Sequence, residues 1–359
     1  MKILIYSPAF FPSVGGLETL VSILAEQFVE SGHEVKIVSQ TPGSAPKGIS
    51  FEIIRRPSAV KLLSLMRWCD LYFQPNISLR GLWPLMFLSR PWVASHNNWY
   101  QRADGRRALQ DRLKHHLARR ATGVSVSRAV ANHVESPSVI IPNAYRADVF
   151  RPMPQVTRNR DLVFAGRLVS DKGCDLLLDA LALLRSRGMK PTLTIVGNGP
   201  EESALRIQTN NLGLAGQVEF AGVRRDSELA QILNAHRIMV VPSRWPEPFG
   251  IVALEGIACG CVVVGSEGGG LKDAIGSCGI TFPNGDAEAL SEAIAALLTD
   301  VQKFESFQTA SEAHLAQHQP AAVAGAYLQV FEKAAERNRR RSRLVNTPVS
   351  ARKARNVKV

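Results

Sequence analysis

Short runs of β-branched residues alternate with longer segments of helical periodicity along almost the whole chain. This alternation restricts the fold more than any other feature, because strands joined by helical crossovers pair in parallel and bury both faces of their sheet under helices. The sequence therefore predicts an α/β protein built on parallel sheets.

The expected elements fall into two series. In the first, strands are expected at 2–6, 34–39, 70–73, 92–95, 122–125 and 139–141, with helices at 16–30, 79–88, 106–119 and 128–134. In the second, strands are expected at 161–165, 193–196, 218–220, 238–241, 261–264 and 280–282, with helices at 174–187, 201–211, 227–234, 250–259 and 288–298. Further helical stretches at 303–317 and 321–337 have no strand between them.

The two series are separated by 143–160, where Pro152, Pro154 and many polar residues interrupt both periodicities. The 359 residues also exceed the ~100–200 of an ordinary domain. We expect two doubly wound, Rossmann-like domains facing each other across a cleft, covering 1–150 and 151–320. A helix at 321–336 would cross back to the first domain, and 337–359 would form a basic, disordered tail.

Charge differs strongly between regions of the chain. Residues 1–155 hold 19 Lys/Arg against 10 Asp/Glu, residues 156–336 hold 15 against 21, and residues 337–359 hold nine against none. The first half places seven cations in one helical region, with four tryptophans nearby in sequence: Arg102, Arg106, Arg107, Arg112, Lys114, Arg119 and Arg120, with Trp68, Trp83, Trp92 and Trp99. Such a surface suits docking to an anionic membrane, and an ordinary solvated basic helix over a tryptophan core is an equal alternative.

The compartment follows from the cysteines and the N-terminus. Five cysteines with no CxxC spacing predict a reducing compartment. MKILIYSPAFFP resembles a strand and loop rather than an export signal, and no window of about 18 uninterrupted apolar residues could span a bilayer. We expect a cytoplasmic protein, or one bound peripherally to the inner face of the plasma membrane.

Common nucleotide motifs fail in this sequence. VGNGPEE at 196–202 carries Glu202 where a dinucleotide fingerprint needs its third glycine, and GSEGGGLKD at 265–273 lacks the GK[ST] of a phosphate loop. No Asp-x-Asp and no His/Cys cluster has metal-ligand spacing, so neither a metal nor a cofactor is expected. A bound diphosphate would have to be neutralised by side-chain cations and backbone amides.

Two segments offer such groups. PSRWPEPFGIVALEGIACGCVVV at 242–264 predicts a strand end, a proline-bounded loop and a helix N-terminus, with Glu247 before it and Glu255 inside a nearly apolar helix. FAGRLVSDKGCDLLLDAL at 164–181 places Arg167 and Lys172 between a strand and a helix. Both Glu and both cations are also compatible with an ordinary solvated surface, although a lone Glu among apolar residues needs a partner.

Together these segments resemble glycosyltransferase family 4, the retaining sugar-nucleotide enzymes of the GT-B fold. GRLVSDKG combines with an E-x7-E pattern formed by Glu247 and Glu255, and further similar motifs span almost the whole chain: GGLE at 15–18, His96 after a strand, VSVSRAV at 124–130, VIIPNAYRADVF at 139–150, LTIVGNGP at 193–200 and GGLKD at 269–273.

The resemblance implies a role for each matched residue. Arg167 and Lys172 would neutralise the donor diphosphate, Glu247 would bind the transferred sugar and Glu255 the ribose. His96 would face the reacting sugar, so the implied catalytic set is His96, Glu247, Arg167 and Lys172. The implied donor site also includes Gly15, Gly16, Phe249, Gly250, Ile251 and Val252.

The sequence departs from the family pattern at three positions. Asp273 stands where the late GG motif usually ends in Glu, which changes a donor contact, while Ala144 and Cys261 are expected to affect packing only. No residue is an obvious nucleophile, so we expect the leaving phosphate to accept the acceptor's proton.

We therefore expect a retaining transfer of a hexosyl group from a UDP- or GDP-sugar to a glycan or lipid-linked acceptor, in the synthesis of surface polysaccharide, lipopolysaccharide or glycolipid. The alternatives are a GT-B-type sugar-nucleotide epimerase, a noncatalytic sugar-nucleotide binder and, less favoured, a nucleic-acid-binding protein, which would leave Glu255 unexplained.

Overall fold

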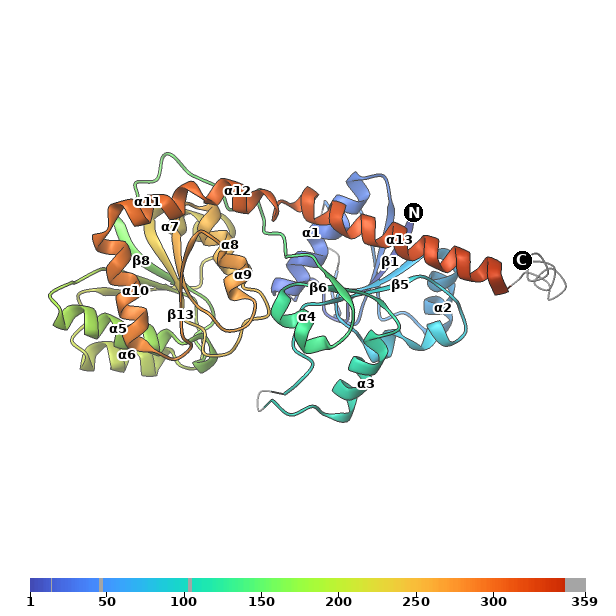
Figure 1. Cartoon of the computed structure of the whole chain (residues 1–359), viewed down its shortest axis with the longest axis horizontal. Coiled ribbons are helices and arrows are strands. Elements are labelled where there is room, and N and C mark those ends of the chain that lie inside the picture. The colour runs from blue at the N-terminus through green and yellow to red at the C-terminus, as the bar shows by residue number, and fades with distance from the viewer. Residues whose placement is uncertain (14, 45–47, 103–104, 346–359) are drawn as a thin grey trace, which may run out of the picture. The chain divides into compact units, whose positions relative to one another are not determined.

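The computed structural model describes residues 1–345 apart from 14, 45–47 and 103–104, and it contains two compact units (Figure 1). Unit one comprises Met1–Ser125, Ala131–Ile141 and the chain from Ala324 onward, and unit two comprises Val126–Val130 and Pro142–Val323. Each unit is one parallel sheet with helices on its faces, which confirms the expected α/β architecture of two Rossmann-like domains. No helix within the described residues is long and apolar enough to cross a membrane.

Unit one is built on a seven-stranded sheet with the order β3-β2-β1-β4-β5-β6-β7. All its pairings are parallel, and the central strands are buried on both faces, as expected for strands covered by helices. The strands are β1 (Lys2–Tyr6), β2 (Glu34–Ser39), β3 (Glu52–Arg55), β4 (Leu71–Gln74), β5 (Trp92–His96), β6 (Thr122–Ser125) and β7 (Ser138–Ile140).

The helices of this unit are α1 (Gly16–Glu30), α2 (Ala59–Trp68), α3 (Leu109–Ala118) and α4 (Arg128–Val134). The prediction of one helix at 79–88 is wrong, because the chain forms two short 3-10 helices there, η1 (Leu79–Gly81) and η2 (Trp83–Met86). Pro84 has no N–H to donate and Gly81 is a poor helix former, so a continuous α-helix is not favoured. Strand β3 and helix α2 were not expected.

The last helix, α13 (Pro320–Val345), is longer than predicted and packs on unit one (Figure 1). Phe331 on α13 lies 5.3 Å from Phe28 of α1 and 5.2 Å from Phe73 of β4, measured between ring centroids. The expectation of disorder from residue 337 is therefore wrong as far as Val345, because arginine is a good helix former and its charge does not break the helix. The rest of the expected tail, 346–359, lies outside the described residues.

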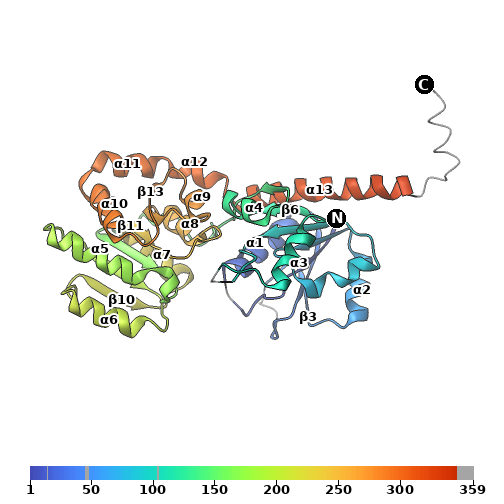
Figure 2. The same cartoon turned by 60° about the horizontal axis from the view of Figure 1, so that its bottom comes forward.

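Unit two is built on a six-stranded parallel sheet with the order β10-β9-β8-β11-β12-β13. Its strands are β8 (Arg160–Ala165), β9 (Leu193–Val196), β10 (Val218–Gly222), β11 (His236–Val241), β12 (Val262–Ser266) and β13 (Gly279–Phe282). Its helices are η3 (Ser170–Lys172), α5 (Cys174–Ser186), α6 (Glu202–Asn211), α7 (Asp226–Ala235), α8 (Ile251–Ala258), α9 (Leu271–Ile275), α10 (Ala287–Thr299), α11 (Val301–Thr309) and α12 (Ser311–Ala316). Figure 2 shows α6 beside the edge strand β10.

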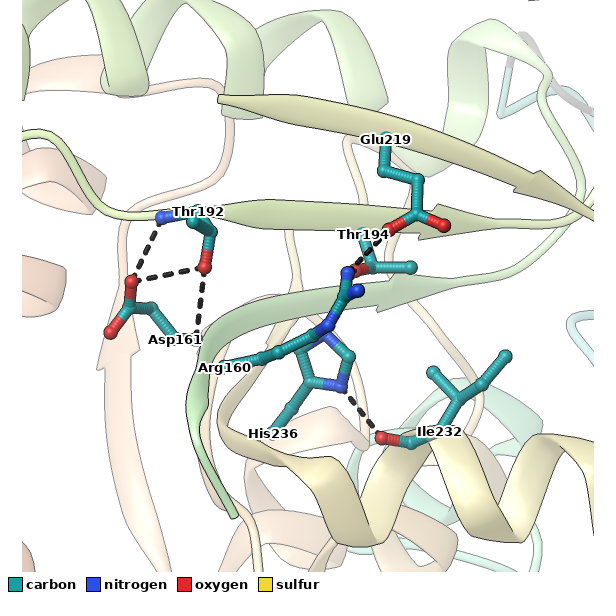
Figure 3. Close-up of polar contacts among 7 residues, drawn as sticks. All are labelled: Arg160, Asp161, Thr192, Thr194, Glu219, Ile232 and His236. Carbon is teal, nitrogen blue, oxygen red and sulfur yellow. Dashed lines mark hydrogen bonds and ion pairs between the residues drawn. The ribbon is translucent and has the colours of Figure 1, made fainter. Parts of the chain in front are cut away.

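A polar network ties the strands together at their amino ends (Figure 3). His236 is buried, and its Nδ1 lies 2.6 Å from the carbonyl oxygen of Ile232, which can only accept, so Nδ1 carries the proton. The other ring nitrogen then accepts from the Thr194 hydroxyl at 2.8 Å. Arg160 donates to Thr194 and pairs with Glu219, so the network links β8, β9, β10 and β11 and fixes their register.

The opposite, carboxyl ends of the strands carry the sequence motifs. Strands β8, β11 and β12 are neighbours in the sheet, and the loops that follow them contain the segments 166–173, 242–250 and 267–270. The three loops therefore meet at one edge of unit two, the edge at which open α/β sheets bind ligands. All five cysteines are free and buried in the two units.

Candidate functional site

The loop from β8 to α5 holds the two predicted cations. Arg167 is exposed, and its side chain has no hydrogen-bond or ion-pair partner among the described residues. Lys172 ends the short helix η3, and Gly173 follows in the left-handed conformation with φ 65°. A side chain at Gly173 would collide with the backbone of Pro242, so glycine lets this loop lie directly against the loop that follows β11.

The two loops are joined by an ion pair between predicted site residues. Lys172 Nζ lies 2.5 Å from Glu247 Oε1, and the Ser243 hydroxyl donates to the same oxygen at 2.8 Å. The backbone supports the pair, because Arg244 N–H donates to the carbonyl oxygen of Asp171 at 2.9 Å. The structure thus brings Lys172 and Glu247 together, while Arg167 remains separate and unpaired among the described residues.

Helix α8 begins next to this pair. Gly250 is its N-cap residue with φ 103°, and Ile251 and Val252 form its first turn. Their N–H groups have no acceptor within the helix, so this end offers donors and a partial positive charge to an anion. Phe249 is buried and packs near His318 with 5.7 Å between ring centroids, so it contributes its backbone rather than an exposed side chain.

Glu255 lies one turn further along α8 and is partly buried. The pKa of its carboxyl is raised to about 8, mainly by burial. The nearby Arg146 opposes this rise and the nearby Asp226 adds to it. Arg146 is itself held by an ion pair with Asp226. This carboxyl is costly to ionise, and its oxygens have no hydrogen-bond partner among the described residues. It can therefore accept hydrogen bonds from ligand hydroxyls, which is the chemistry that a ribose offers.

Sequence reasoning missed the residues that hold the loop after β12. Gly270 N–H donates to the carbonyl oxygen of Glu247 at 2.7 Å, and Asn284 accepts from Gly268 N–H at 2.8 Å while donating to the carbonyl oxygen of Ser243 at 2.9 Å. The turn sequence PNGD at 283–286 was the available signal for Asn284.

The segment 126–130 belongs to the same unit and contacts the same loops. Ser127 donates its hydroxyl to the carbonyl oxygen of Pro248 at 2.8 Å. Asp273, where the family pattern has Glu, accepts from the backbone N–H of Arg128 at 3.0 Å. The shorter carboxylate is thus engaged by the protein itself. Ala144 and Cys261 are both buried.

The remaining predicted residues lie in unit one. Gly15 is the N-cap residue of α1, Gly16 is the first residue of that helix, and a Cβ at Gly15 would stand 2.6 Å from Glu18 Oε2. Glu18 also accepts from the Ser13 hydroxyl at 3.2 Å. A side chain at position 15 would therefore displace the Glu18 carboxylate from its present position.

His96 is the last residue of β5 and is fully buried. Its Nδ1 lies 2.9 Å from the hydroxyl of Tyr100, and that hydroxyl accepts from the N–H of Ile77 at 3.1 Å. The Tyr100 hydroxyl proton has no acceptor other than Nδ1 among the described residues, so this arrangement favours Nδ1 as the acceptor and the ring proton on Nε2. Nε2 has no partner among the described residues.

Burial, reinforced by neighbouring His115, lowers the pKa of His96 to about 4. The ring is therefore neutral near pH 7 and presents Nε2–H, a hydrogen-bond donor that cannot accept a proton at that atom. Tyr100, four residues after His96, was not singled out from the sequence.

The arrangement in unit two combines cations, helix amides and two carboxyl groups, those of Glu247 and Glu255, at one sheet edge. These groups can bind an anion and hydroxyls side by side. Among the described residues, no group of three or more His, Cys, Asp and Glu is placed to hold a metal ion.

Comparison with known proteins agrees with this chemistry. Residues 148–314 match the family described as "Glycosyl transferases group 1". This segment, just under half of the chain, is therefore similar to the glycosyltransferases of that group. The chain is 34% identical over 181 residues to a D-inositol 3-phosphate glycosyltransferase of Jonesia denitrificans, covering 48% of this chain and 42% of that relative.

Two further comparisons span nearly the whole chain. A phosphatidyl-myo-inositol mannosyltransferase of Mycobacterium leprae is 26% identical over 382 residues, which cover 93% of this chain and 97% of that protein. The structure of HepE from Anabaena in complex with UDP superposes with a TM-score of 0.79 at 20% identity, covering 93% of this chain and all 100% of that one. The chain therefore has the GT-B fold.

Proposed function

We propose that this protein is a glycosyltransferase that moves a hexosyl group from a UDP- or GDP-sugar to a glycan or lipid-linked acceptor, with retention of the anomeric configuration and without a metal. Arg167, Lys172 and the first amides of α8 would bind the diphosphate, Glu247 the sugar hydroxyls and Glu255 the ribose. Gly15 and Gly16 would let the first loop of unit one approach the phosphate.

The observation that carries the proposal is the Lys172–Glu247 pair beside the N-terminus of α8, 2.5 Å between Nζ and Oε1. A donor would exchange this contact for two others: Lys172 would turn to a phosphate oxygen, and Glu247 would accept from a sugar hydroxyl. As the sugar–phosphate bond breaks, negative charge grows on the leaving oxygen and positive charge on the sugar. Fixed cations at the leaving oxygen are where electrostatic stabilisation has its largest effect.

His96 would act as a neutral donor. Its Nε2–H can hydrogen-bond to the reacting sugar, but a ring with a pKa of about 4 is a poor base near pH 7. The acceptor's proton then has to leave by another route, and the departing phosphate is the group that gains basicity in the reaction. This favours attack on the same face from which the diphosphate departs, which retains the configuration.

The names of the relatives guide the proposed partners. One relative acts on a D-inositol phosphate, another on a phosphatidyl-myo-inositol, and HepE was solved with UDP. We extend the proposal to acceptors of surface polysaccharide, lipopolysaccharide or glycolipid synthesis, used on the cytoplasmic side of the plasma membrane. The exposed cations Arg112, Arg119 and Arg120 at and just after α3 are compatible with an anionic surface.

The testing experiment is a thermal-shift screen against UDP, GDP, ADP and their hexose conjugates, each with and without EDTA. A native-state ligand raises stability by mass action, about 2.7 kcal/mol at 100 times its Kd. We expect one nucleotide to shift the transition with or without EDTA. Lys172→Met should remove most of that shift, whereas Lys190→Met, a matched change at an exposed lysine, should keep it.

Product analysis then distinguishes the remaining functions. Transfer to an added acceptor with the donor's anomeric configuration supports the proposal. Conversion of the donor without an acceptor indicates an epimerase, and binding without any turnover indicates a noncatalytic binder. No shift with any nucleotide at millimolar concentration contradicts the donor site itself.

A further inference from the structure

Unit one contains a large open groove that none of the predicted site residues lines. Its volume is about 1150 Å³, and it is formed by η1 and η2 with the chain that follows them, by the C-terminal half of α3, and by α13. Trp92 and Thr122 line it, and they are the first residues of β5 and β6. The groove therefore lies at the amino ends of these strands, whereas His96 stands at the carboxyl end of β5.

The side chains that line the groove are mostly apolar, and some of them are exposed to solvent. Met86 and Phe87 line it with relative exposures of 79% and 72%, and the Phe87 ring packs against Trp83 with 6.3 Å between centroids. Large apolar side chains at that exposure, gathered on one concave surface, indicate a place where another apolar group binds.

The charges in the groove have one sign. Arg90, Arg120 and Arg337 line it, and none of the lining residues is an aspartate or glutamate. Arg120 and Arg337 are exposed and have no ion-pair partner among the described residues. Arg90 donates to the carbonyl oxygens of Met66 and Arg67 at 2.8 and 2.7 Å, so its guanidinium is fixed in place without a carboxylate to cancel its charge.

We propose that this groove binds an anionic lipid of a bilayer, with hydrocarbon on the Trp83–Phe87 wall and the phosphate between Arg120 and Arg337. An apolar body with a negative head is the ligand that matches both the lining and the charge. The chain's own segment 346–359 is a poor occupant, because it adds four more cations and no anion. The groove lies at the opposite end of β5 from His96, so it anchors the protein without occupying the surroundings of that proposed site residue.

Two double variants test the two halves of the groove. Arg120→Ala with Arg337→Ala removes charge, and Met86→Ser with Phe87→Ser removes apolar surface. Matched controls in unit two are Arg187→Ala, an exposed arginine, and Ile207→Ser, an isoleucine that is 61% exposed. Binding of the full chain is measured by flotation with two kinds of vesicle. One is phosphatidylcholine alone, and the other contains about 30% phosphatidylglycerol as the anionic probe, which gives its surface a negative potential.

We expect binding to the phosphatidylglycerol vesicles only, a loss of about tenfold or more for each double variant, and changes of less than about twofold for the controls. Equal binding to both vesicle types overturns the proposal, as does phosphatidylglycerol binding that neither double variant weakens. A stable dimer in light scattering that Met86→Ser with Phe87→Ser dissolves would instead assign the groove to a second copy of the chain. Because neither donor nor acceptor is present, failure here leaves the proposed transfer reaction untouched.

Discussion

The contact between Gly173 and Pro242 allows a quantitative test of how the loop that holds Lys172 is positioned. Gly173 and Gly188 flank helix α5, and both are left-handed, with φ of 65° and 82°. Substitution by alanine costs about 1–2 kcal/mol at either position, because a Cβ is unfavourable in this conformation. The two glycines differ in their surroundings: a Cβ at 188 would meet nothing within 4 Å, whereas one at 173 would lie 3.1 Å from the carbonyl carbon of Pro242 and closer still to its oxygen.

Gly173→Ala therefore adds an overlap between two backbones, neither of which can rotate away. Overpacking of this kind costs about 1–3 kcal/mol, so the total is about 2–5 kcal/mol against about 1–2 for Gly188→Ala. At about 2–4 °C per kcal/mol for a unit of this size, we expect Gly188→Ala to lower the Tm by about 2–8 °C and Gly173→Ala by roughly twice as much.

Calorimetry on both variants measures the stabilities, and titration with the nucleotide found in the thermal-shift screen measures the function. If Gly173 holds Lys172 against Glu247, Gly173→Ala weakens donor binding in the protein that remains folded, while Gly188→Ala leaves the affinity unchanged. Equal losses of Tm for the two variants would refute the reasoning, because they would mean that the Pro242 contact carries no cost.

Three further predictions concern charge. Glu247→Gln should lower the transfer rate by about 10²–10³-fold through lost sugar positioning while changing the Tm little, since a partly exposed ion pair is worth at most about 1 kcal/mol; steady-state kinetics and calorimetry check both parts. Burial lowers the pKa of both His96 and His318 from 6.5 to about 4. Between these pH values the unfolded chain binds more protons than the folded one, so the free energy of unfolding should fall as the pH drops from 6.5 toward 4. Urea titrations across that range should show a smaller fall for His318→Gln than for the unmodified chain. Burial raises the pKa of Glu255 to about 8 from 4.5, so its contribution to stability declines as pH rises through this interval, and Glu255→Gln should gain stability relative to the native chain at pH 8 but not at pH 4.5.

The strands were the most predictable part of the fold. Strands β1, β2, β6 and β9 have the predicted bounds because each is a compact β-branched or apolar run between polar residues or turn residues. Strand β3 and helix α2 were missed, although Ser58 caps α2 by accepting from Lys61 N–H at 3.2 Å, and a serine before an apolar run is a recognisable start signal.

The limits of sequence reasoning are clearest at the site. The loops around Arg167 and Glu247 could be placed at one sheet edge, because parallel strands end on the same side. The pairing of Lys172 with Glu247 could not, since it depends on the Gly173–Pro242 approach between segments about 70 residues apart in the sequence. The tautomer of His96 depends in the same way on contacts that the sequence does not show. The Tyr100 hydroxyl lies against Nδ1 of His96 and accepts from the N–H of Ile77.

The Lys172–Glu247 pair also explains how the proposed diphosphate site could exist before its ligand arrives. Uncompensated cations next to the positive end of α8 would repel one another, and Glu247 supplies the missing charge within the protein. A diphosphate brings more negative charge than one carboxylate, so it can take over Lys172 and release Glu247 toward the sugar. Binding of the phosphates and capture of the sugar hydroxyls are then coupled, because both depend on opening the same 2.5 Å contact.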